Sequence, residues 1–401
     1  SESFFTKHFQ HNIALGQHTW NDRAPFSAFL SFSQPHISVI FGRDTVAWGR
    51  GNTGDLIIGG QAPFHDFLQY TIYDKRFAYT FNALFFDDIK DGKADSTSFY
   101  DQGKRIFTAK RFEVSFSPRV RAALSSIALY YASGLDIRMF SPLMWEHNFV
   151  NQSNDNDVAP GSFNGDNNAM ALEIEVAVTP HWGLYGEFFL DQIQHSGEVG
   201  GSTSAYEPNA FGFLAGAQFS YPHHTGRLTG FVETVYNTPS LYLKGDPGIP
   251  SNDDDTNHRM LSNLPFVRSN SGRNESGVGF IGYQYGPDTF LLATGVEYEQ
   301  PRAYTLKADL EFSIHGVHGL AAHGRKTNHL TEVSSPLEGL LLDAGNGALE
   351  FRLAGGLEGR KVFSRFLSGF TRVDIMNQWN RRNIPGNHFS DLQLTIGGSL
   401  S

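Results

Sequence analysis

Residues 171–192, ALEIEVAVTPHWGLYGEFFLDQ, contain two alternating segments joined by a short turn. In the first segment Leu172 and Ile174 fall on one face of an extended chain, and Glu173 and Glu175 fall on the other, because successive side chains of a β-strand point to opposite faces. The second segment divides in the same way, with Trp182, Leu184, Phe188 and Leu190 on its apolar face and Tyr185, Glu187 and Asp191 on its polar face. The stretch predicts a β-hairpin with one apolar face and one acidic face.

The same alternation recurs along most of the chain, in segments of about ten residues that are bounded by turn residues. Residues 304–314, YTLKADLEFSI, are a second clear case. In a soluble β-sandwich the apolar face would form the core, whereas in a membrane barrel it would meet lipid and the polar face would line the lumen. The alternation by itself fits both architectures.

The composition excludes several classes of protein. The 401 residues include 42 Gly and 35 Phe but no Cys, and the mean hydropathy is −0.31. No run of about 18 apolar residues occurs, which excludes a membrane-spanning helix but leaves a closed barrel open. Without cysteine there are no thiolate metal sites or cysteine nucleophiles. The net charge of −10 disfavours a nucleic-acid partner.

The lengths of the connections favour a membrane barrel. Short turns, such as 117–120, 179–182 and 221–227, alternate with long polar loops near 87–104, 132–168, 193–208, 238–274 and 325–346. Short turns on one rim and long loops on the other are typical of outer-membrane barrels. The sequence therefore predicts an all-β fold, a transmembrane antiparallel β-barrel of about 18 strands (roughly 16–18), with short periplasmic turns and long extracellular loops.

The predicted barrel is a single domain over residues 1–401, with residues 1–20 as a periplasmic or plug-like N-terminal segment. Its expected location is the outer membrane of a Gram-negative type of cell, where membrane lipid would be a partner. The first residue is Ser1 rather than Met, which fits removal of a signal peptide or a shortened chain.

A glycine-rich segment, residues 45–64, interrupts the alternation and is called the elbow here. Together with the residues just before it, the elbow resembles the Wzi family of capsule-assembly outer-membrane proteins, whose members carry a Trp-Gly-x-Gly turn, an apolar pair and an Asn/Gln-Ala-Pro step in this order. The matching residues are Gly42, Arg43, Asp44, Trp48, Gly49, Gly51, Leu56, Ile57, Gln61, Ala62 and Pro63. Residues 111–149, 172–192 and 231–242 also look like strands of this family. The resemblance implies an 18-stranded outer-membrane barrel that acts as a surface lectin for capsular polysaccharide.

The elbow carries the candidate ligand-binding residues. Trp48 offers a flat apolar face for a sugar ring, and Arg43, Asp44 and Arg50 offer donors and acceptors for hydroxyl or uronate groups. The alternative is structural, with glycines that let the chain bend and a tryptophan that anchors an inward-folded loop. In either case the segment has about 20 residues, which is too many for a tight turn. It also contains Leu56, Ile57 and Ile58, which are too apolar to be exposed to water, so the segment is expected to lie inside the barrel wall.

Acidic residues on the polar faces of the predicted strands are the second group of candidates. Glu173, Glu175, Glu187 and Asp191 are expected to line the lumen, and the same alternation adds Glu113, Glu233, Asp309 and Glu311. Basic residues expected to face them are Lys110 or Arg111, Arg119, Arg121, Arg227, Lys307 and Arg372. A pair of these acids could serve a glycosidase, but a solvated polar lining is the ordinary state of such a lumen.

Other motifs point to no catalysis and no cofactor. No nucleophile elbow, phosphate-binding loop or dinucleotide-binding fingerprint occurs, so we expect a protein that is not an enzyme. The histidines at 315, 318, 323 and 329 could suggest a metal site, and residues 151–168 and 251–258 could suggest calcium loops. Neither group has the spacing of an established metal motif, so no metal is expected.

Two functions remain open at this point. One is a lectin-like anchor for a capsular polysaccharide or exopolysaccharide, and the other is a porin-like channel for passive uptake of sugars or other small polar solutes. A soluble exported β-protein is a third possibility. The expected partner is a polysaccharide or oligosaccharide, and the sequence does not define the oligomeric state.

Overall fold

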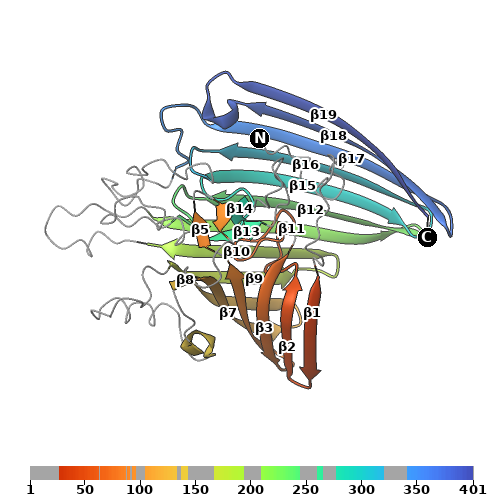
Figure 1. Cartoon of the computed structure of the whole chain (residues 1–401). Coiled ribbons are helices and arrows are strands. Elements are labelled where there is room, and N and C mark those ends of the chain that lie inside the picture. The colour runs from red at the N-terminus through yellow and green to blue at the C-terminus, as the bar shows by residue number, and fades with distance from the viewer. Residues whose placement is uncertain are drawn as a thin grey trace.

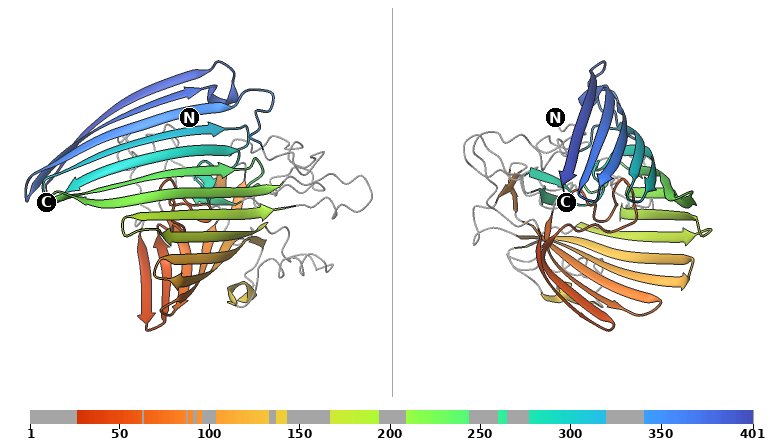
Figure 2. Two further views of the ribbon diagram at one scale, coloured as in Figure 1. Left: turned by 180° about the vertical axis from the view of Figure 1, so that it is seen from behind. Right: turned by 90° about the vertical axis from the view of Figure 1, so that its right-hand side faces the viewer.

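The computed structural model describes residues 27–62, 64–86, 88–90, 93–95, 104–132, 137–142, 167–193, 209–243, 260–264, 277–319 and 341–400. Most of these residues belong to one antiparallel sheet of 15 strands, in which each strand pairs with the next strand of that sheet along the chain. Figure 2 shows that the sheet curves around a hollow side. Within the described residues, no helix is long and apolar enough to cross a membrane.

The first strands of the main sheet are β1 (Ala28–Gln34), β2 (Ile37–Asp44), β3 (His65–Tyr73), β4 (Phe77–Phe86), β7 (Lys104–Ser117), β8 (Val120–Ala132), β9 (Asn167–Ala177) and β10 (Trp182–Gln192). The others are β11 (Ala210–His223), β12 (Gly226–Asn237), β15 (Thr289–Gln300), β16 (Tyr304–His315), β17 (Glu350–Ser364), β18 (Leu367–Trp379) and β19 (His388–Leu400). Two small hairpins, β5 (Asp88–Lys90) with β6 (Lys93–Asp95) and β13 (Leu261–Leu264) with β14 (Gly277–Phe280), lie outside this sheet (Figure 1). Short 3-10 helices are η1 (Ile137–Phe140) and η3 (Arg381–Asn383).

The two rims of the sheet differ as the sequence predicts. Short connections such as 118–119, 178–181 and 224–225 join strands at one end, here called the turn rim, and long connections join them at the other, the loop rim. The strand order begins at β1 and ends at β19, and no pairing between these two strands occurs among the described residues. Closure of the barrel and a count of about 18 strands therefore stay predictions, as does the role of residues 1–20, which lie outside the described residues.

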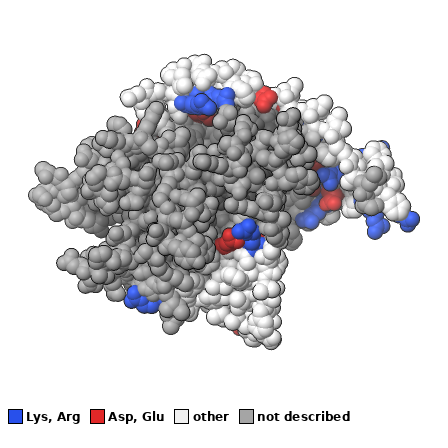
Figure 3. Space-filling view, in the orientation of Figure 1, with Lys and Arg blue, Asp and Glu red and all other residues white. Residues whose placement is uncertain are grey.

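The alternation of the sequence separates the two faces of the sheet. We call the face that contacts the elbow the inner face and the opposite one the outer face. Ile174 is 48% exposed and Leu310 is 50% exposed on the outer face, as are further apolar side chains there: Leu172, Leu184, Val232, Leu292, Leu306, Leu357, Ile375 and Leu394. Figure 3 shows that the described surface over β1 and β2 carries few charged side chains. An apolar surface of this extent fits contact with lipid.

Two features of the fold differ from the prediction. The connection expected as a polar loop over 238–274 runs from 238 to 288, and Tyr283 and Tyr285 within it join the interior. In addition, the outer face is not bare everywhere, because Phe140 of η1 packs on Phe81 of β4 with ring centroids 5.5 Å apart. The alternation alone could not show that a connection folds back over its own strands.

Candidate functional site

The elbow crosses the inner face and pairs with other parts of the chain by backbone hydrogen bonds. The amide of Trp48 donates to the carbonyl of Ile58 at 2.9 Å, and the amide of Gly59 donates to the carbonyl of Ile281 at 2.8 Å. Leu56, Ile57 and Ile58 are buried within the hydrophobic cluster that fills this part of the interior. The apolar run that the sequence marked as unsuited to water is thus covered by the strands of the sheet.

Glu187 of β10 is the first wall residue that fixes the elbow. Its Oε2 accepts a hydrogen bond from the amide of Leu56 at 2.8 Å, and its Oε1 accepts one from the amide of Arg50 at 3.2 Å. A Cβ at Gly49, whose φ is +147°, would collide with the carboxylates of Glu187 and Asp55. Glycine is therefore required where the backbone approaches this acidic pair.

Asp55 lies beside Glu187 and was not among the residues expected from the sequence. Its Oδ1 accepts a hydrogen bond from the amide of Gly51 at 2.8 Å. Burial raises the pKa of Asp55 to about 6, while hydrogen bonds from Gly51 and with Glu187 lower it. No pattern in the sequence marks Asp55 as buried, because aspartate before an apolar run is usually an exposed turn residue.

Glu233 of β12 is the second wall residue that fixes the elbow. Its two oxygens accept hydrogen bonds from the amide of Asn52 at 2.7 Å and the amide of Thr53 at 2.9 Å. The Thr53 hydroxyl also contacts Glu233, and the Tyr185 hydroxyl donates to it at 2.7 Å. Because the carboxylate is fully buried, these charge-assisted bonds replace its lost hydration.

Trp48 does not offer its ring to a ligand. The residue is only 9% exposed, and the guanidinium of Arg111 lies over the ring, 5.9 Å from its centre. Arg111 also pairs with Glu173 of β9 at 2.9 Å and with Glu113 at 3.3 Å. This burial opposes the interpretation of Trp48 as a sugar platform and agrees with the alternative, a tryptophan that anchors an inward-folded loop.

The other candidates of the elbow region separate from Trp48. Arg43 belongs to β2, and its side chain pairs with Asp66 of β3 through two hydrogen bonds of 2.7 Å. The register places both side chains on the outer face, which corrects the interpretation of Arg43 as a lumen residue. Asp44, at the end of β2, accepts a hydrogen bond from the amide of Thr45 at 2.8 Å, a contact that shapes the local turn. The grouping of Arg43 with the elbow extended the ligand site too far into this strand.

Arg50 and Glu175 remain open to solvent on the inner face. They form an ion pair at 2.7 Å, with 54% of the arginine side chain and 27% of the glutamate side chain exposed. Asp191 is used differently, because its Oδ2 accepts a hydrogen bond from the backbone amide of Tyr242 at 3.0 Å. Of the residues predicted to line the lumen, Glu187 and Asp191 thus hold neighbouring backbone, and Arg50 and Glu175 are accessible to a ligand.

Charged side chains continue along the inner face toward the last strands. Arg372 of β18 contacts Asp309 at 3.0 Å and Asp374 at 2.8 Å, and Lys307 of β16 contacts Glu297 at 2.7 Å. The predicted pairing of acids with bases across this face is therefore present, with Arg111 rather than Lys110 on the inner side. A cavity of about 580 Å³ lies over β10, β11, β12, β15 and β16 near the turn rim.

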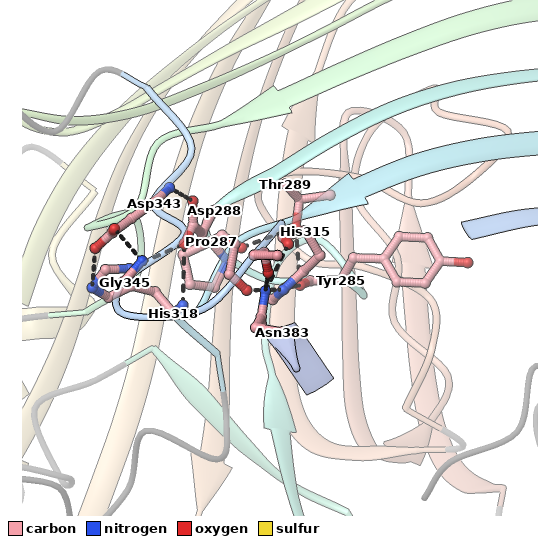
Figure 4. A network of polar contacts seen from close by, with 11 residues as sticks. Tyr285, Pro287, Asp288, Thr289, His315, His318, Asp343, Gly345 and Asn383 are labelled. Carbon is pink, nitrogen blue, oxygen red and sulfur yellow. Dashed lines mark hydrogen bonds and ion pairs between the residues drawn. The ribbon is translucent and has the colours of Figure 1, made fainter. Parts of the chain in front are cut away.

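A second polar network fixes connections at the loop rim (Figure 4). The carboxylate of Asp288 accepts hydrogen bonds from the amide of Asp343 at 2.8 Å and from the amide of His318 at 3.1 Å, and it lies 3.0 Å from Nδ1 of His318. Burial raises the pKa of Asp288 to about 7. His315 contacts backbone carbonyl oxygens, so the two described histidines of the suggested metal cluster have separate partners. The histidines at 323 and 329 lie outside the described residues, as does the suggested calcium loop at 251–258. Of the suggested loop at 151–168, only residues 167 and 168 are described, and they belong to β9.

Comparisons with known proteins place this fold among membrane barrels. No family model and no curated protein sequence matches the chain. The structure is similar to that of Wzi from Escherichia coli, with a TM-score of 0.52 and 13% sequence identity over 93% of this chain and 68% of that one. Wzi is described as an outer membrane protein involved in group 1 capsule assembly and as a carbohydrate-binding β-barrel.

Two structures from Pseudomonas aeruginosa are similar at lower TM-scores. OprD has a TM-score of 0.39 and 10% identity, over 91% of this chain and 78% of its own. A FadL homologue has a TM-score of 0.29 and 12% identity, over 90% of this chain and 85% of its own. The likeness to Wzi, at this low identity, shows the fold alone. The chain has the fold of outer-membrane β-barrel proteins, and a location in an outer membrane is inferred from that fold.

Proposed function

We propose that this protein is an outer-membrane barrel that binds a surface polysaccharide, capsular or exopolysaccharide, as a lectin-like anchor. The observation that carries the proposal is the elbow, which two buried carboxylates hold on the inner face through four backbone amides. A channel needs a continuous path for water, whereas a firmly held segment in the interior obstructs one. A filled interior therefore supports binding over bulk diffusion.

The hydrogen bonds of the elbow support a fixed state of this segment. Carboxylates that accept backbone N–H groups in a buried site form stronger bonds than neutral acceptors do. Releasing the elbow would leave Glu187 and Glu233 without these donors and would expose Leu56, Ile57 and Ile58. Both changes cost free energy, so the obstructed arrangement is the stable one.

The same arrangement supports binding rather than catalysis. Asp55 and Glu187 lie side by side, as two acids of a hydrolase would, but backbone amides of the elbow occupy both oxygens of Glu187 and Oδ1 of Asp55, and the two side chains also contact each other. Neither carboxylate is free to contact a substrate while the elbow stays in place. We propose that these acids are structural and that the protein is not an enzyme.

Two measurements on the purified protein test the proposal. We expect low ion conductance in a planar lipid bilayer, and we expect deletion of residues 51–60 to raise it, because the obstructing segment is then shortened. A glycan array should show carbohydrate-dependent binding by the intact protein. A large conductance that the deletion leaves unchanged would contradict the obstructed interior. A glycan array with no bound glycan would contradict the lectin function.

A channel for small polar solutes is the second candidate. The 580 Å³ cavity on the inner face, lined by polar and charged side chains such as Arg227, Glu297 and Lys307, favours passage of hydrated solutes beside the elbow. Liposome swelling separates the two functions. Swelling in small sugars together with a blank glycan array would favour the channel.

A further inference from the structure

A second cavity lies on the inner face at the turn rim, next to the exposed end of the elbow. Its volume is about 470 Å³, within the range of roughly 300–1,000 Å³ that small-molecule sites occupy. The turn between β3 and β4, the turn between β7 and β8, and strands β9 and β10 surround it. Arg50 of the elbow and Gln218 of β11 line it as well, so several distant parts of the sequence contribute to one cavity.

Basic side chains dominate the lining of this cavity. The charged residues that line it are Arg50, Lys75, Arg76, Arg119, Arg121 and Glu175. Arg50 is paired with Glu175 at 2.7 Å, and Arg121 is paired with Glu113 at 3.5 Å. Within the described part of the chain, no ion pair involves the side chains of Lys75, Arg76 or Arg119, so these three cations have no ion-pair partner among the described residues.

These three cations stand on short turns whose backbones are tied to neighbouring strands. The carbonyl of Arg76 accepts a hydrogen bond from the amide of Ser115 at 2.9 Å, and the carbonyl of Arg119 accepts one from the amide of Ala177 at 2.8 Å. The backbone of these turns is therefore fixed, whereas the exposed side chains have to be ordered when a ligand binds, which costs part of the binding free energy. The cavity offers an anion three cations at fixed backbone positions.

We propose that this cavity binds the carboxylate of an acidic sugar, a uronate unit. Arg76 and Arg119 carry planar guanidinium groups, which match a carboxylate by paired hydrogen bonds, and Lys75 adds a point charge. Ser115 and Gln218 also line the cavity and supply polar groups for sugar hydroxyls. The volume exceeds what a lone inorganic anion needs, which favours a sugar that carries the anion. The inference rests on the proposed binding of carbohydrate and specifies that the carbohydrate is acidic.

Isothermal titration calorimetry of the full chain in detergent tests the site, with sodium glucuronate, glucose and inorganic phosphate as the probes. The cavity variant is K75Q/R76Q/R119Q. The control is R302Q/K361Q/R365Q, which removes the same charge from turns and strand ends of the same rim outside the cavity. We expect the intact protein to bind glucuronate in preference to glucose, the cavity variant to bind it at least about tenfold more weakly, and the control to match the intact protein. The variant K75R/R76K/R119K keeps the charge but removes the planar guanidinium groups at 76 and 119, so it should bind glucuronate more weakly than the intact protein and more tightly than the cavity variant. All variants should keep the heat-dependent gel shift of a folded barrel.

Three results would overturn the assignment. They are equal binding of glucuronate and glucose, equal losses in the two triple variants, and no glucuronate binding by the intact protein, whether or not it binds phosphate. A glycan array with neutral glycans reports on the proposed anchor independently. If the protein binds neutral glycans but not glucuronate, the proposed site is wrong and the proposed lectin function is still supported. If it binds glucuronate, loses this binding only in the cavity variant and binds no glycan on the array, the site is supported and the lectin function is contradicted.

Discussion

Glu233→Gln tests how the elbow is held on the inner face. The wild-type carboxylate accepts hydrogen bonds from the amides of Asn52 and Thr53 and from the hydroxyl of Tyr185. A glutamine keeps the shape but replaces one oxygen by an NH₂ group that cannot accept, and it removes the charge from the remaining oxygen. One backbone N–H then stays buried without an acceptor, and the other bonds weaken, so docking of the elbow should lose about 2–4 kcal/mol.

Hydrogen–deuterium exchange measures this loss directly. With a factor of ten for every 1.4 kcal/mol, amides 50–56 should exchange roughly 30- to 1,000-fold faster in Glu233→Gln than in the wild type. The matched control is Glu297→Gln, which removes the same charge from the same face. Glu297 forms an ion pair with Lys307 in which both side chains are about one third or more exposed, so its loss should leave the elbow amides unchanged.

The reasoning would be refuted if amides 50–56 exchanged equally in Glu233→Gln and the wild type. Faster exchange across β16, β17 and β18 as well would signal global unfolding instead of release of the elbow. Release should also raise the bilayer conductance of Glu233→Gln, because the elbow is the segment that obstructs the interior.

The outer face, Trp48 and Asp55 give three further predictions. Ile174→Arg and Leu310→Arg should each destabilise the barrel in lipid by about 2–4 kcal/mol if the sites lie near the membrane midplane; refolding into liposomes measures this, and a wild-type protein that is soluble and monomeric without detergent would contradict it. Trp48→Ala should lower the free energy of unfolding by about 3–5 kcal/mol because it leaves a cavity, and it should not change the affinity for any glycan that the wild type binds. A lower glycan affinity with an unchanged melting temperature would instead support Trp48 as a sugar platform. Because the folded-state pKa of Asp55 is raised from 3.8 to about 6, docking of the elbow should weaken as pH rises from about 4 to about 6. Exchange at several pH values should show this weakening, and Asp55→Asn should reduce it, since Glu187 beside Asp55 remains titratable.

The two faces of the sheet could be predicted from the residues alone. Alternation is a local property, since side chains two residues apart share a face whatever the strand pairs with. Leu172 and Ile174 therefore could be assigned to one face and Glu173 and Glu175 to the other from the alternation alone, and the register confirms the division. Turn positions were local in the same sense, because Pro, Gly and polar residues mark them directly.

The position of the elbow and the residues that hold it follow only from the three-dimensional structure. Its anchors are remote, since 137 residues separate Arg50 from Glu187 and 181 residues separate Asn52 from Glu233. No pattern within the elbow identifies which wall acids accept its amides, so Glu187 was predicted as lumen lining when it is a buried acceptor. Arg43 was also predicted to face the lumen, but it faces outward. The register of β2 with β3 places it opposite Asp66, and this register involves a strand that the local pattern around Arg43 does not identify. Local periodicity fixes the faces of a strand, whereas the contents of the interior depend on contacts that form only when distant segments meet.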